Sequence, residues 1–554
     1  MADLITRVYS GFRGVDFRGD EISLLRSPDS LNVWKDYRET ESIRTRPGMK
    51  LQTAFADKVY GIFFYKNMQI VHSGTALYRI VAGEKTILKS GVKAARSEAF
   101  VYENKWYFKD GANYLEYDGL TIKDIEGYVP TTTIGRKPMG GGTKYQDVNM
   151  LQARRKNSFL ADGTSVEYHL DATNIDEIMP KVTVDGKETR DFSVDYGRGV
   201  ITFNTAPAAP LTDGQDNVVV EFSRTVSGYR DTILKCNILQ MFDNRVFFSG
   251  NPDYPNTIWH CSLDDPGYCS DQDYYREGLD EASVRGLVAG NNALWVFREP
   301  SQTNTTIFYH TPTLDEEYGK IYPSSHSSIA IGCVGKAVNF GDDIVFFSDR
   351  GMEGISSDIT TEQVAAHRSS LVDRKLIIEP KYKDMLLAEW EGYLFVFVGN
   401  KAYLADSRTA FNNEGHIEYD WYYWDMLKDI ESVCVQGGVM YLGTSDGVYT
   451  LNDYNASVES WWTTPKDKFK SPNKQKTTNK RGCVSEGTGD VTVLAKTEDT
   501  DFEEVGAFEG VTDYFVTRIK QKKFKDLQLK FWSGTRFSLE TVTLECFLGG
   551  YIKR

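Results

Sequence analysis

A short phrase of strands and turns recurs along the chain and limits the folds that the sequence can adopt. Its plainest copy spans residues 335–357, where the β-branched and aromatic run Ile344–Phe347 predicts a buried strand. The turn-forming segments Gly341–Asp343 and Ser348–Gly351 flank this run. The phrase therefore predicts a three-strand meander within about twenty residues.

Seven copies of this phrase can be recognised. They begin at Val59, Ala99, Ile238, Val284, Gly335, Asp384 and Glu431. From the third copy onward, successive starts are 46, 51, 49 and 47 residues apart. A period near fifty residues with about four short strands is typical of propeller blades. We therefore expect an all-β fold built on a β-propeller of about seven blades.

The repeats are interrupted once and are flanked at both ends by segments of another kind. We expect N-terminal lead-in strands in residues 1–50, propeller blades in 51–127 and 231–455, an inserted small β-sandwich in 128–230, and a C-terminal β-sandwich in 456–554. The lead-in strands are expected to close the propeller by pairing with the last blade, because closure removes exposed strand edges. Alternating residues around Asp185–Gly186 predict a hairpin within the insert.

Charge and hydropathy exclude several classes of protein. The formal net charge of −14 argues against a surface that grips nucleic acid through its phosphates, and favours either plain solubility or a wall past which DNA slides. No run approaches eighteen apolar residues, so we expect no membrane span, and the first residues lack the apolar core of a Sec-type signal. Seven scattered cysteines predict reduced thiols and synthesis in a cytoplasm.

The chain carries no familiar catalytic or nucleotide-binding motif, so we expect no enzyme, no cofactor and no metal. His260, Cys261 and Cys269 are close in sequence but lack the paired spacing of a structural zinc site. The adjacent carboxylates Asp264–Asp265 and Asp342–Asp343 are predicted to be turn residues. A glycosidase would need two carboxylates that face each other across a sugar.

Two aromatic clusters and one helix-like segment complete the candidate features. The run Trp421–Trp424 could stack on sugar rings, but in an outer strand two of its members should face the core and two the outside. Trp461 and Trp462 are expected to form a packed hinge at the start of the C-terminal domain, or part of an interface. Residues 360–377 have apolar positions near helical spacing and predict a short helix.

A basic run stands out from the acidic remainder of the chain. It contains Lys466, Lys468, Lys470, Lys474, Lys476, Lys480 and Arg481, against one acid, Asp467. A solvated loop is one interpretation. The other is an interface between subunits, in which the basic run meets the acidic surface of a neighbour and sets the register of the contact.

Several phrases carry a resemblance to a known class of protein. They are GFRGVDFRGD and SPDSLNVWKDYRETESIRTRPGMK near the start, FLADGTSVEYHL, VTVDGKE and FSVDYGRGVITFNTAPAAP in the insert, and SWWTTPKDKF, KKFKDLQLKF and LETVTLECFLGG near the end. In these phrases the chain resembles the tail-tube nozzle and head-completion (stabilisation) proteins of short-tailed bacteriophages. The resemblance covers most of the chain.

The resemblance implies a structural virion protein of the tail, assembled in the host cytoplasm. Such proteins are built on a propeller and form a ring, expected here to be a homohexamer, below the portal and adaptor proteins. The ring carries tail fibre or plug proteins, and DNA passes through it without sequence-specific binding. The axial position, nozzle or tube segment, stays open because this chain is shorter than the better-known nozzle proteins.

Two other functions are compatible with a propeller. One is a glycan-binding or glycan-cleaving receptor-binding protein, which would need an acidic pair facing a pocket at the propeller's centre. The other is a cellular scaffold that binds peptides. The insert and the C-terminal sandwich make the scaffold the less natural of the two.

Overall fold

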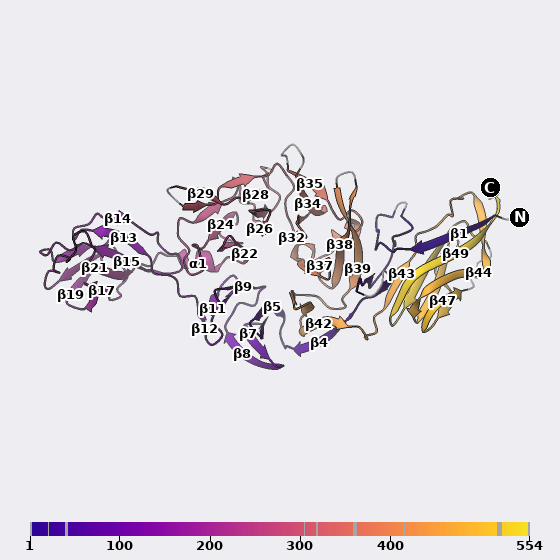
Figure 1. Cartoon of the computed structure of the whole chain (residues 1–554), viewed down its shortest axis with the longest axis horizontal. Coiled ribbons are helices and arrows are strands. Elements are labelled where there is room, and N and C mark those ends of the chain that lie inside the picture. Colours follow the sequence, from indigo (N-terminus) through magenta and orange to yellow (C-terminus); the bar gives the residue numbers. More distant parts are fainter. Residues whose placement is uncertain are drawn as a thin grey trace. The chain divides into compact units, whose positions relative to one another are not determined.

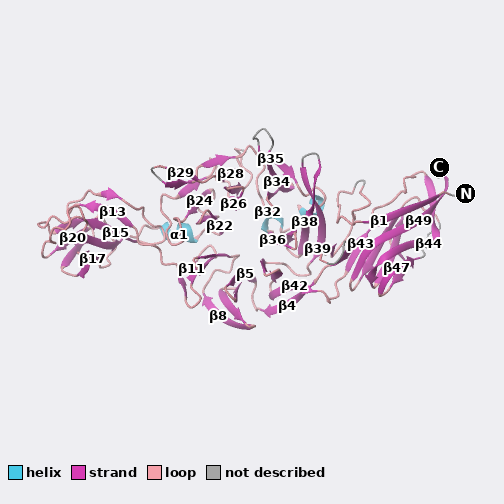
Figure 2. Cartoon of the chain, viewed as in Figure 1, coloured by secondary structure: helices cyan, strands magenta, loops and turns pink. Residues whose placement is uncertain are grey.

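The computed structural model describes residues 3–19, 22–38, 42–303, 305–316, 319–357, 363–413, 416–517 and 523–551. Strands make up most of the regular structure, as Figure 2 shows. Helical structure within the described ranges is limited to α1 (Tyr229–Leu234), α2 (Asp373–Leu376) and one 3₁₀ turn (Tyr382–Asp384). The chain divides into two compact units, the first formed by Met1–Ile87 with Ser327–Arg554 and the second by Leu88–His326.

Four of the predicted repeats form four-stranded antiparallel sheets in the first unit. Their strands are β5 (Val59–Tyr65), β6 (Met68–Ser73), β7 (Ala76–Val81) and β8 (Glu84–Ser90); β32 (Ala337–Phe340), β33 (Asp343–Ser348), β34 (Gly351–Ser357) and β35 (Gln363–His367); β36 (Leu386–Trp390), β37 (Tyr393–Val398), β38 (Lys401–Asn413) and β39 (His416–Asp425); and β40 (Ser432–Gln436), β41 (Val439–Gly443) and β42 (Gly447–Asp453), joined by β4 (Gly48–Ala54). The second strands β33 and β37 are buried along their whole length, because both faces of each sheet are covered.

The first strands of neighbouring sheets lie against one another in this unit. Strand β36 packs against β40, and β40 packs against β5. The sheet of the last repeat therefore lies beside the sheet of the first, and a shared apolar cluster that includes Val59 and Val448 fills the space between them. Strand β4 adds a fourth strand to the last repeat by pairing antiparallel with β42.

The second unit contains the other three repeat sheets. Their strands are β9 (Glu98–Tyr102), β10 (Lys105–Lys109), β11 (Tyr114–Tyr117) and β12 (Ile122–Asp124); β22 (Ile238–Phe242), β23 (Arg245–Ser249), β24 (Thr257–His260) and β25 (Tyr274–Arg276); and β26 (Val284–Gly290), β27 (Ala293–Arg298), β28 (Ile307–His310) and β31 (Ser324–His326). A separate hairpin, β29 (Thr313–Asp315) with β30 (Gly319–Ile321), precedes β31. Here too first strands are neighbours, since β9 and β26 both contact β22.

The insert between β12 and α1 has two sheets. The larger contains β13 (Thr131–Arg136), β14 (Thr143–Lys144), β15 (Arg154–Phe159), β17 (Lys181–Val184), β18 (Lys187–Thr189) and β21 (Val218–Ser223), and the smaller contains β16 (Glu167–His169), β19 (Phe192–Asp195) and β20 (Val200–Phe203). Phe159 and Val220 from the larger sheet share one core with Tyr168 and Ile201 from the smaller. Figure 1 shows these strands set apart from the repeat sheets of the same unit.

The two ends of the chain build the C-terminal domain together. One sheet contains β43 (Ser460–Thr463), β45 (Val491–Thr497), β46 (Glu503–Phe508) and β48 (Leu527–Ser533). The other contains β44 (Lys474–Gly489), β47 (Val511–Thr517) and β49 (Phe537–Tyr551), with β1 (Leu4–Ser10), β2 (Val33–Lys35) and β3 (Ile43–Thr45) from the N-terminus. In Figure 1 the indigo strand β1 lies along the yellow strand β49.

This arrangement corrects the role expected for residues 1–50. Of the lead-in strands, β4 is the one that pairs with the last repeat, and it begins at Gly48. Strands β1 and β3 pair with β49 instead. The physical reason is burial, since Tyr9, Val33 and Ile43 lie in the core shared with Leu539 and its neighbours on β49.

The lead-in also covers β39, the outermost strand of its sheet. The backbone N–H of Val15 donates to the carbonyl oxygen of Trp421 (2.7 Å), and that of Asn32 donates to Tyr423 (3.0 Å). Trp34 contacts Trp424 edge-on, with ring centroids 5.5 Å apart. A sheet edge that would otherwise expose unpaired backbone groups is thereby closed.

The covering of β39 corrects the expectation for the aromatic run. Two of its four members were expected outside, yet Trp421, Tyr422 and Trp424 are all fully buried and Tyr423 is half-buried. One face of the strand packs into the cluster around Trp34, and the other packs into a second cluster with Val15. These aromatic rings are core residues and offer no platform for a sugar.

Buried charges fasten the lead-in to the same strand. The buried carboxylate of Asp420 accepts hydrogen bonds from Arg13 Nε and Arg26 Nη2, both at 2.8 Å. Two guanidinium groups therefore satisfy one carboxylate that would be costly to bury alone. Between them, Gly14 has a φ of +76° and approaches β39 so closely that a Cβ there would lie 1.9 Å from the carbonyl oxygen of Trp421.

The predicted helix at 360–377 is wrong over most of its described length. Residues 360–362 lie outside the described ranges, Gln363–His367 form strand β35, and α2 is a single turn. Pairing of β35 with β34, which places Ala366 opposite Gly354, outweighs the local helical pattern.

We predict that Gly14→Ala destabilises the first unit, because its new methyl group collides with the backbone of β39. The matched control is Gly11→Ala, since Gly11 also has a positive φ (+63°) but a methyl group added to it would meet no atom within 4 Å. We expect Gly14→Ala to cost about 1–3 kcal/mol more than the control in the free energy of unfolding. Equal unfolding midpoints in urea for the two variants would contradict the docked position of the lead-in.

We predict a pH-dependent contribution to stability from His367, whose ring contacts the carboxylates of Glu353 on β34 and Asp373 on α2. Burial alone would lower the pKa of His367, but hydrogen bonds to Asp373 and Glu353 outweigh burial and raise it to about 9. Because the pKa is higher in the folded state than its ordinary 6.5, the stabilisation is complete below pH 6.5 and disappears as the pH rises through about 9.

The measurement is the apparent Tm between pH 6 and about 9.5 for the wild type and His367→Gln. In the variant, the apparent Tm should fall less steeply with rising pH, because the contribution of His367 is missing. His326→Gln serves as the control, since His326 is exposed on β31. If His367→Gln and wild type run parallel over this pH range, His367 is not held charged in the folded state.

Candidate functional site

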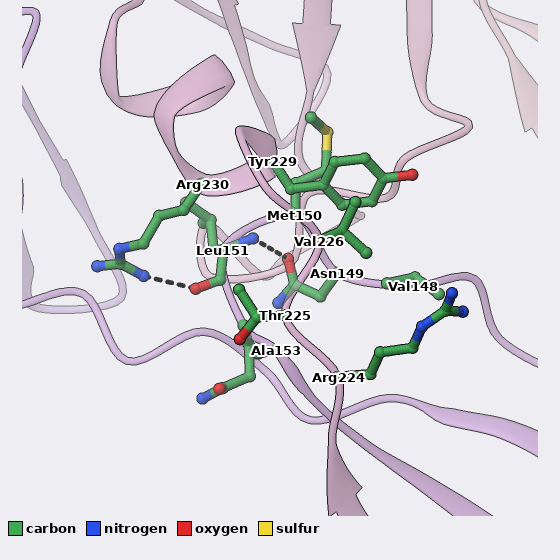
Figure 3. Close-up of a pocket in the computed structure, with 11 residues that line it drawn as sticks. Val148, Asn149, Met150, Leu151, Ala153, Arg224, Thr225, Val226, Tyr229 and Arg230 are labelled. Carbon is green, nitrogen blue, oxygen red and sulfur yellow. Dashed lines mark hydrogen bonds between the residues drawn. The ribbon is translucent and has the colours of Figure 1, made fainter. Parts of the chain in front are cut away.

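The insert joins the repeat sheets of the second unit through a neck that encloses a pocket of about 290 Å³ (Figure 3). Two segments form the neck: residues 148–153, which lead into β15, and residues 224–228, which connect β21 to α1. The lining residues are Val148, Asn149, Met150, Leu151, Gln152, Ala153, Arg224, Thr225, Val226, Tyr229 and Arg230. The pocket therefore lies where two folded bodies of this unit meet, which is a common position for binding sites.

The buried side chain of Asn149 fastens the neck. Its amide nitrogen donates to the carbonyl oxygens of Tyr128 (2.9 Å) and Gly267 (2.8 Å). Its amide oxygen accepts from the backbone N–H groups of Leu151 (3.0 Å) and Cys269 (3.1 Å). The side chain thus makes four hydrogen bonds, two to the loop after β24 and two to the chain segments that form the neck.

Short helix α1 forms another wall, and two cations hold it in place. Arg230 on α1 donates to the carbonyl oxygens of Leu151 and Ile125, and Figure 3 shows the first of these bonds as a dashed line. Lys109 donates to the carbonyl oxygen of Ile233 (2.7 Å) at the helix C-terminus, where carbonyl groups lack helical partners. Burial lowers the pKa of Lys109 to about 8.

A second pocket of about 290 Å³ adjoins the first and shares Met150 and Tyr229 with it. Its lining residues are Met150, Ser227, Gly228, Tyr229, Thr232, Tyr254, Thr257, Trp259, Asp271, Tyr274 and Arg276. Four of these are aromatic. Tyr254 and Tyr274 are 45% and 48% exposed, so two rings are available to a ligand, and the pocket is suited to binding.

The basic run does not form a solvated loop throughout, which corrects one of its two interpretations. From Lys474 onward it belongs to strand β44. Lys476 is fully buried, and its Nζ donates to the carbonyl oxygens of Ser471 and Lys525, both at 2.6 Å. The prediction that Lys476 is an interface residue is therefore wrong, because its ammonium group is buried and hydrogen-bonded within its own domain.

The other members of the basic run differ in their surroundings. Lys466, Lys468 and Lys470 are exposed, and alternate with the buried Asp467 and Phe469. Lys466 forms an ion pair with Asp526 at 3.2 Å, and Lys474 is half-buried. The side chains of Lys480 and Arg481 lie outside the described part of the chain. The exposed lysines at 466, 468 and 470 are the ones that stay compatible with a contact between subunits.

Both tryptophans at the start of the C-terminal domain pack within the chain. Trp462 is buried and contacts Phe12 edge-on, with centroids 5.0 Å apart. Trp461 is half-buried, and the Lys530 ammonium lies 3.9 Å from its ring centroid. The packing partner Phe12 comes from the lead-in, which ties Trp462 to the N-terminus.

The adjacent carboxylates lie in turns except for Asp343, which begins strand β33. Asp343 is buried and accepts hydrogen bonds from Arg368 Nε (2.9 Å) and the Tyr419 hydroxyl (2.8 Å), while Asp342 has a φ of +70°. Asp264 accepts a hydrogen bond from the Tyr102 hydroxyl at 2.6 Å. Neither pair has two carboxylates facing each other across open space.

The cysteine-rich segment is packed as core. Cys261 and Cys269 are buried in the apolar cluster of the second unit, and His260 contacts the carbonyl oxygen of Cys261. Within the described ranges, no three His, Cys, Asp or Glu side chains are grouped so that they could hold a metal ion. No described helix has both the length and the apolarity needed to cross a bilayer.

Sequence reasoning missed both pockets. Their walls come from the neck, from α1 and from the ends of β24 and β25, which are far apart in the sequence. The exposed aromatic residues Tyr254 and Tyr274 are ordinary in a chain with 32 tyrosines, so composition gives no signal that would single them out.

Comparisons with known proteins assign no family. No family model matches the chain, and no curated protein matches its sequence. Solved structures with a likeness include the computationally designed protein Ika8 (10% identity, 74% of this chain and 99% of that chain, TM-score 0.30). They also include BamB from Moraxella catarrhalis (11%, 71% and 82%, 0.32) and an exo-β-1,3-galactanase from Phanerochaete chrysosporium (8%, 55% and 94%, 0.23). TM-scores of this size carry no inference about function.

We predict that Asn149→Ala loosens the neck, because four backbone groups lose their partners. We expect the local free energy of opening to fall by about 1–3 kcal/mol. Limited proteolysis should then cut within the neck at least roughly tenfold faster than in the wild type. The control is Asn204→Ala, since Asn204 is exposed and, among the described residues, its side chain bonds to Asp191 alone. Equal cleavage rates for the two variants would contradict this role of Asn149.

Proposed function

We propose that this protein is a structural component of the tail of a short-tailed bacteriophage, where copies of the chain form a ring that conducts the genome out of the particle. The observation that supports this most directly is the locking of both chain ends into one domain. Strand β1 pairs with β49 over seven residues, from Leu4 opposite Phe547 to Ser10 opposite Thr541. In this proposal the domain is a building block that resists unravelling.

The repeat sheets serve as blades of a β-propeller in this proposal. Support comes from the contacts between first strands within each unit, which are the contacts that radially arranged blades make. The last repeat lies beside the first, and β4 completes the last repeat from the N-terminal side. A propeller of about seven blades would give a stiff block that holds its shape when neighbours press on it.

Chain ends that are paired within one domain suit a protein that must withstand mechanical force. To pull the N-terminus away, a force must separate β1 and β3 from β49. It must also detach the segment between β1 and β3 from β39. It must also expose the carboxylate of Asp420, which two arginines neutralise in the folded state. Because these elements are bonded to one another, a force applied at one point is distributed over several strands.

The charge of the chain suits a conduit for DNA. With a net charge of −14, the protein as a whole repels phosphate groups, and DNA would pass without being held by lysine or arginine. The proposed partners are the chain itself in a homohexamer, portal and adaptor proteins, and tail fibre or plug proteins. The exposed Lys466, Lys468 and Lys470 are the proposed basic side of the contact between copies.

The test is the assembly state of the purified full-length chain and its presence in particles. We predict rings with a central hole in negative-stain images, and a mass from light scattering that is six times that of the protomer. The double variant Lys468→Glu with Lys470→Glu should reduce the ring fraction, since it reverses charge at the proposed contact. A compact monomer at high concentration that is also missing from virions would contradict the proposal.

A further inference from the structure

The aromatic pocket, defined above as the second of the two pockets, has the chemistry of a ligand site that the structural role does not use. Tyr254 precedes β24, and Tyr274 begins β25 opposite Trp259, so exposed rings from two segments line one pocket. Trp259 lies behind them at 5% exposure and contacts Tyr254 edge-on, with centroids 6.0 Å apart. A ligand would meet aromatic surface that is already ordered.

The polar groups of the pocket are also held in place. The Tyr229 hydroxyl donates to Asp271 at 3.1 Å, which orients this carboxylate toward the shared wall. The Thr257 side chain is 2% exposed, and its hydroxyl oxygen has no hydrogen-bond partner. The Arg276 side chain is exposed, and its guanidinium makes no hydrogen bond or ion pair with the residues that the structure describes. The pocket lining thus includes one guanidinium and one carboxylate.

The balance of charge selects the class of ligand. One carboxylate and one guanidinium give the lining no net charge. A neutral ligand therefore has the smallest desolvation cost when it enters the pocket. An organic cation would be drawn to the aromatic rings but repelled by Arg276. Single-stranded nucleic acid would stack on the rings, but it needs a surrounding basic surface that a chain of net charge −14 does not offer.

A saccharide fits these conditions. The C–H face of a sugar ring is apolar and carries slight positive charge, so it packs on the negative face of an aromatic ring. Its hydroxyl groups both donate and accept, and can bond to Asp271, Arg276 and a threonine hydroxyl at once. A volume of about 290 Å³ is small for a ligand pocket and suits one or two sugar units.

We infer that the aromatic pocket binds a neutral saccharide unit of a larger glycan, with Tyr254 and Tyr274 as stacking surfaces and Arg276 and Asp271 as hydrogen-bonding groups. This inference goes beyond the proposed ring function and is independent of it. The site carries no pair of facing carboxylates, so the glycan is bound and not cleaved.

The experiment is a screen of the full-length protein on an array of neutral glucan, galactan and N-acetylhexosamine oligosaccharides, followed by calorimetric titration with the best one. We expect binding that Tyr254→Ala, Tyr274→Ala and Arg276→Ala each weaken by roughly tenfold or more. All three side chains are exposed, so these substitutions leave the core intact. Tyr145→Ala is the matched control, since Tyr145 is 63% exposed and lies outside the pocket; its affinity should equal that of the wild type.

Two competing ligands are titrated alongside, choline for the cation class and an oligothymidine for single-stranded nucleic acid. No binding on the array would overturn the inference. It would also be overturned if the three variants bound the oligosaccharide as the wild type does, or if choline or the oligothymidine bound with the same dependence on Tyr254 and Tyr274. Loss of glycan binding in a ring that still assembles leaves the proposed structural function untouched.

Discussion

Antiparallel pairing between the two ends of the chain is the interaction on which the first unit depends. Strand β49 accepts β1 and β3 along one edge, while the segment between these strands covers β39 and buries its aromatic residues. The short N-terminal strands β1, β2 and β3 depend on β49, because short isolated strands are marginal in water. The larger sheet of the C-terminal domain is assembled only when β1, β3 and β49 have come together.

In the second unit, the insert is attached to the repeat sheets through the neck, and the strands of the repeats stay paired. The neck is fastened by directional bonds, in which Asn149 and Arg230 bind backbone groups from several segments, and by apolar packing of Met150 and Leu151. Such an attachment is specific in position and leaves pockets where the bodies meet. The pocket is confined to the second unit, whereas the repeat sheets of the proposed structural role occur in both units, so exposed pocket residues can be changed without removing a repeat.

A structural role and a binding site are compatible in one chain, because they use different surfaces. The central strands β33 and β37 of two repeat sheets are fully buried, so their side chains are closed to a ligand. The aromatic pocket places Tyr254, Tyr274 and Arg276 at the periphery of one sheet, where a ligand can reach them. Fold and site are separable here, as they are in many folds.

The sequence by itself determined the local elements, because strand periodicity and turn chemistry act over a few residues. Each predicted repeat begins within two residues of an observed first strand, and Asp185–Gly186 has the positive φ values of a hairpin turn. Only the tertiary structure decided which strands share an edge, and those choices bury Lys476, enclose both faces of Trp421–Trp424 and assemble the pocket. Partners hundreds of residues apart leave no periodic trace in the sequence, since their pairing depends on where the whole chain brings their edges together.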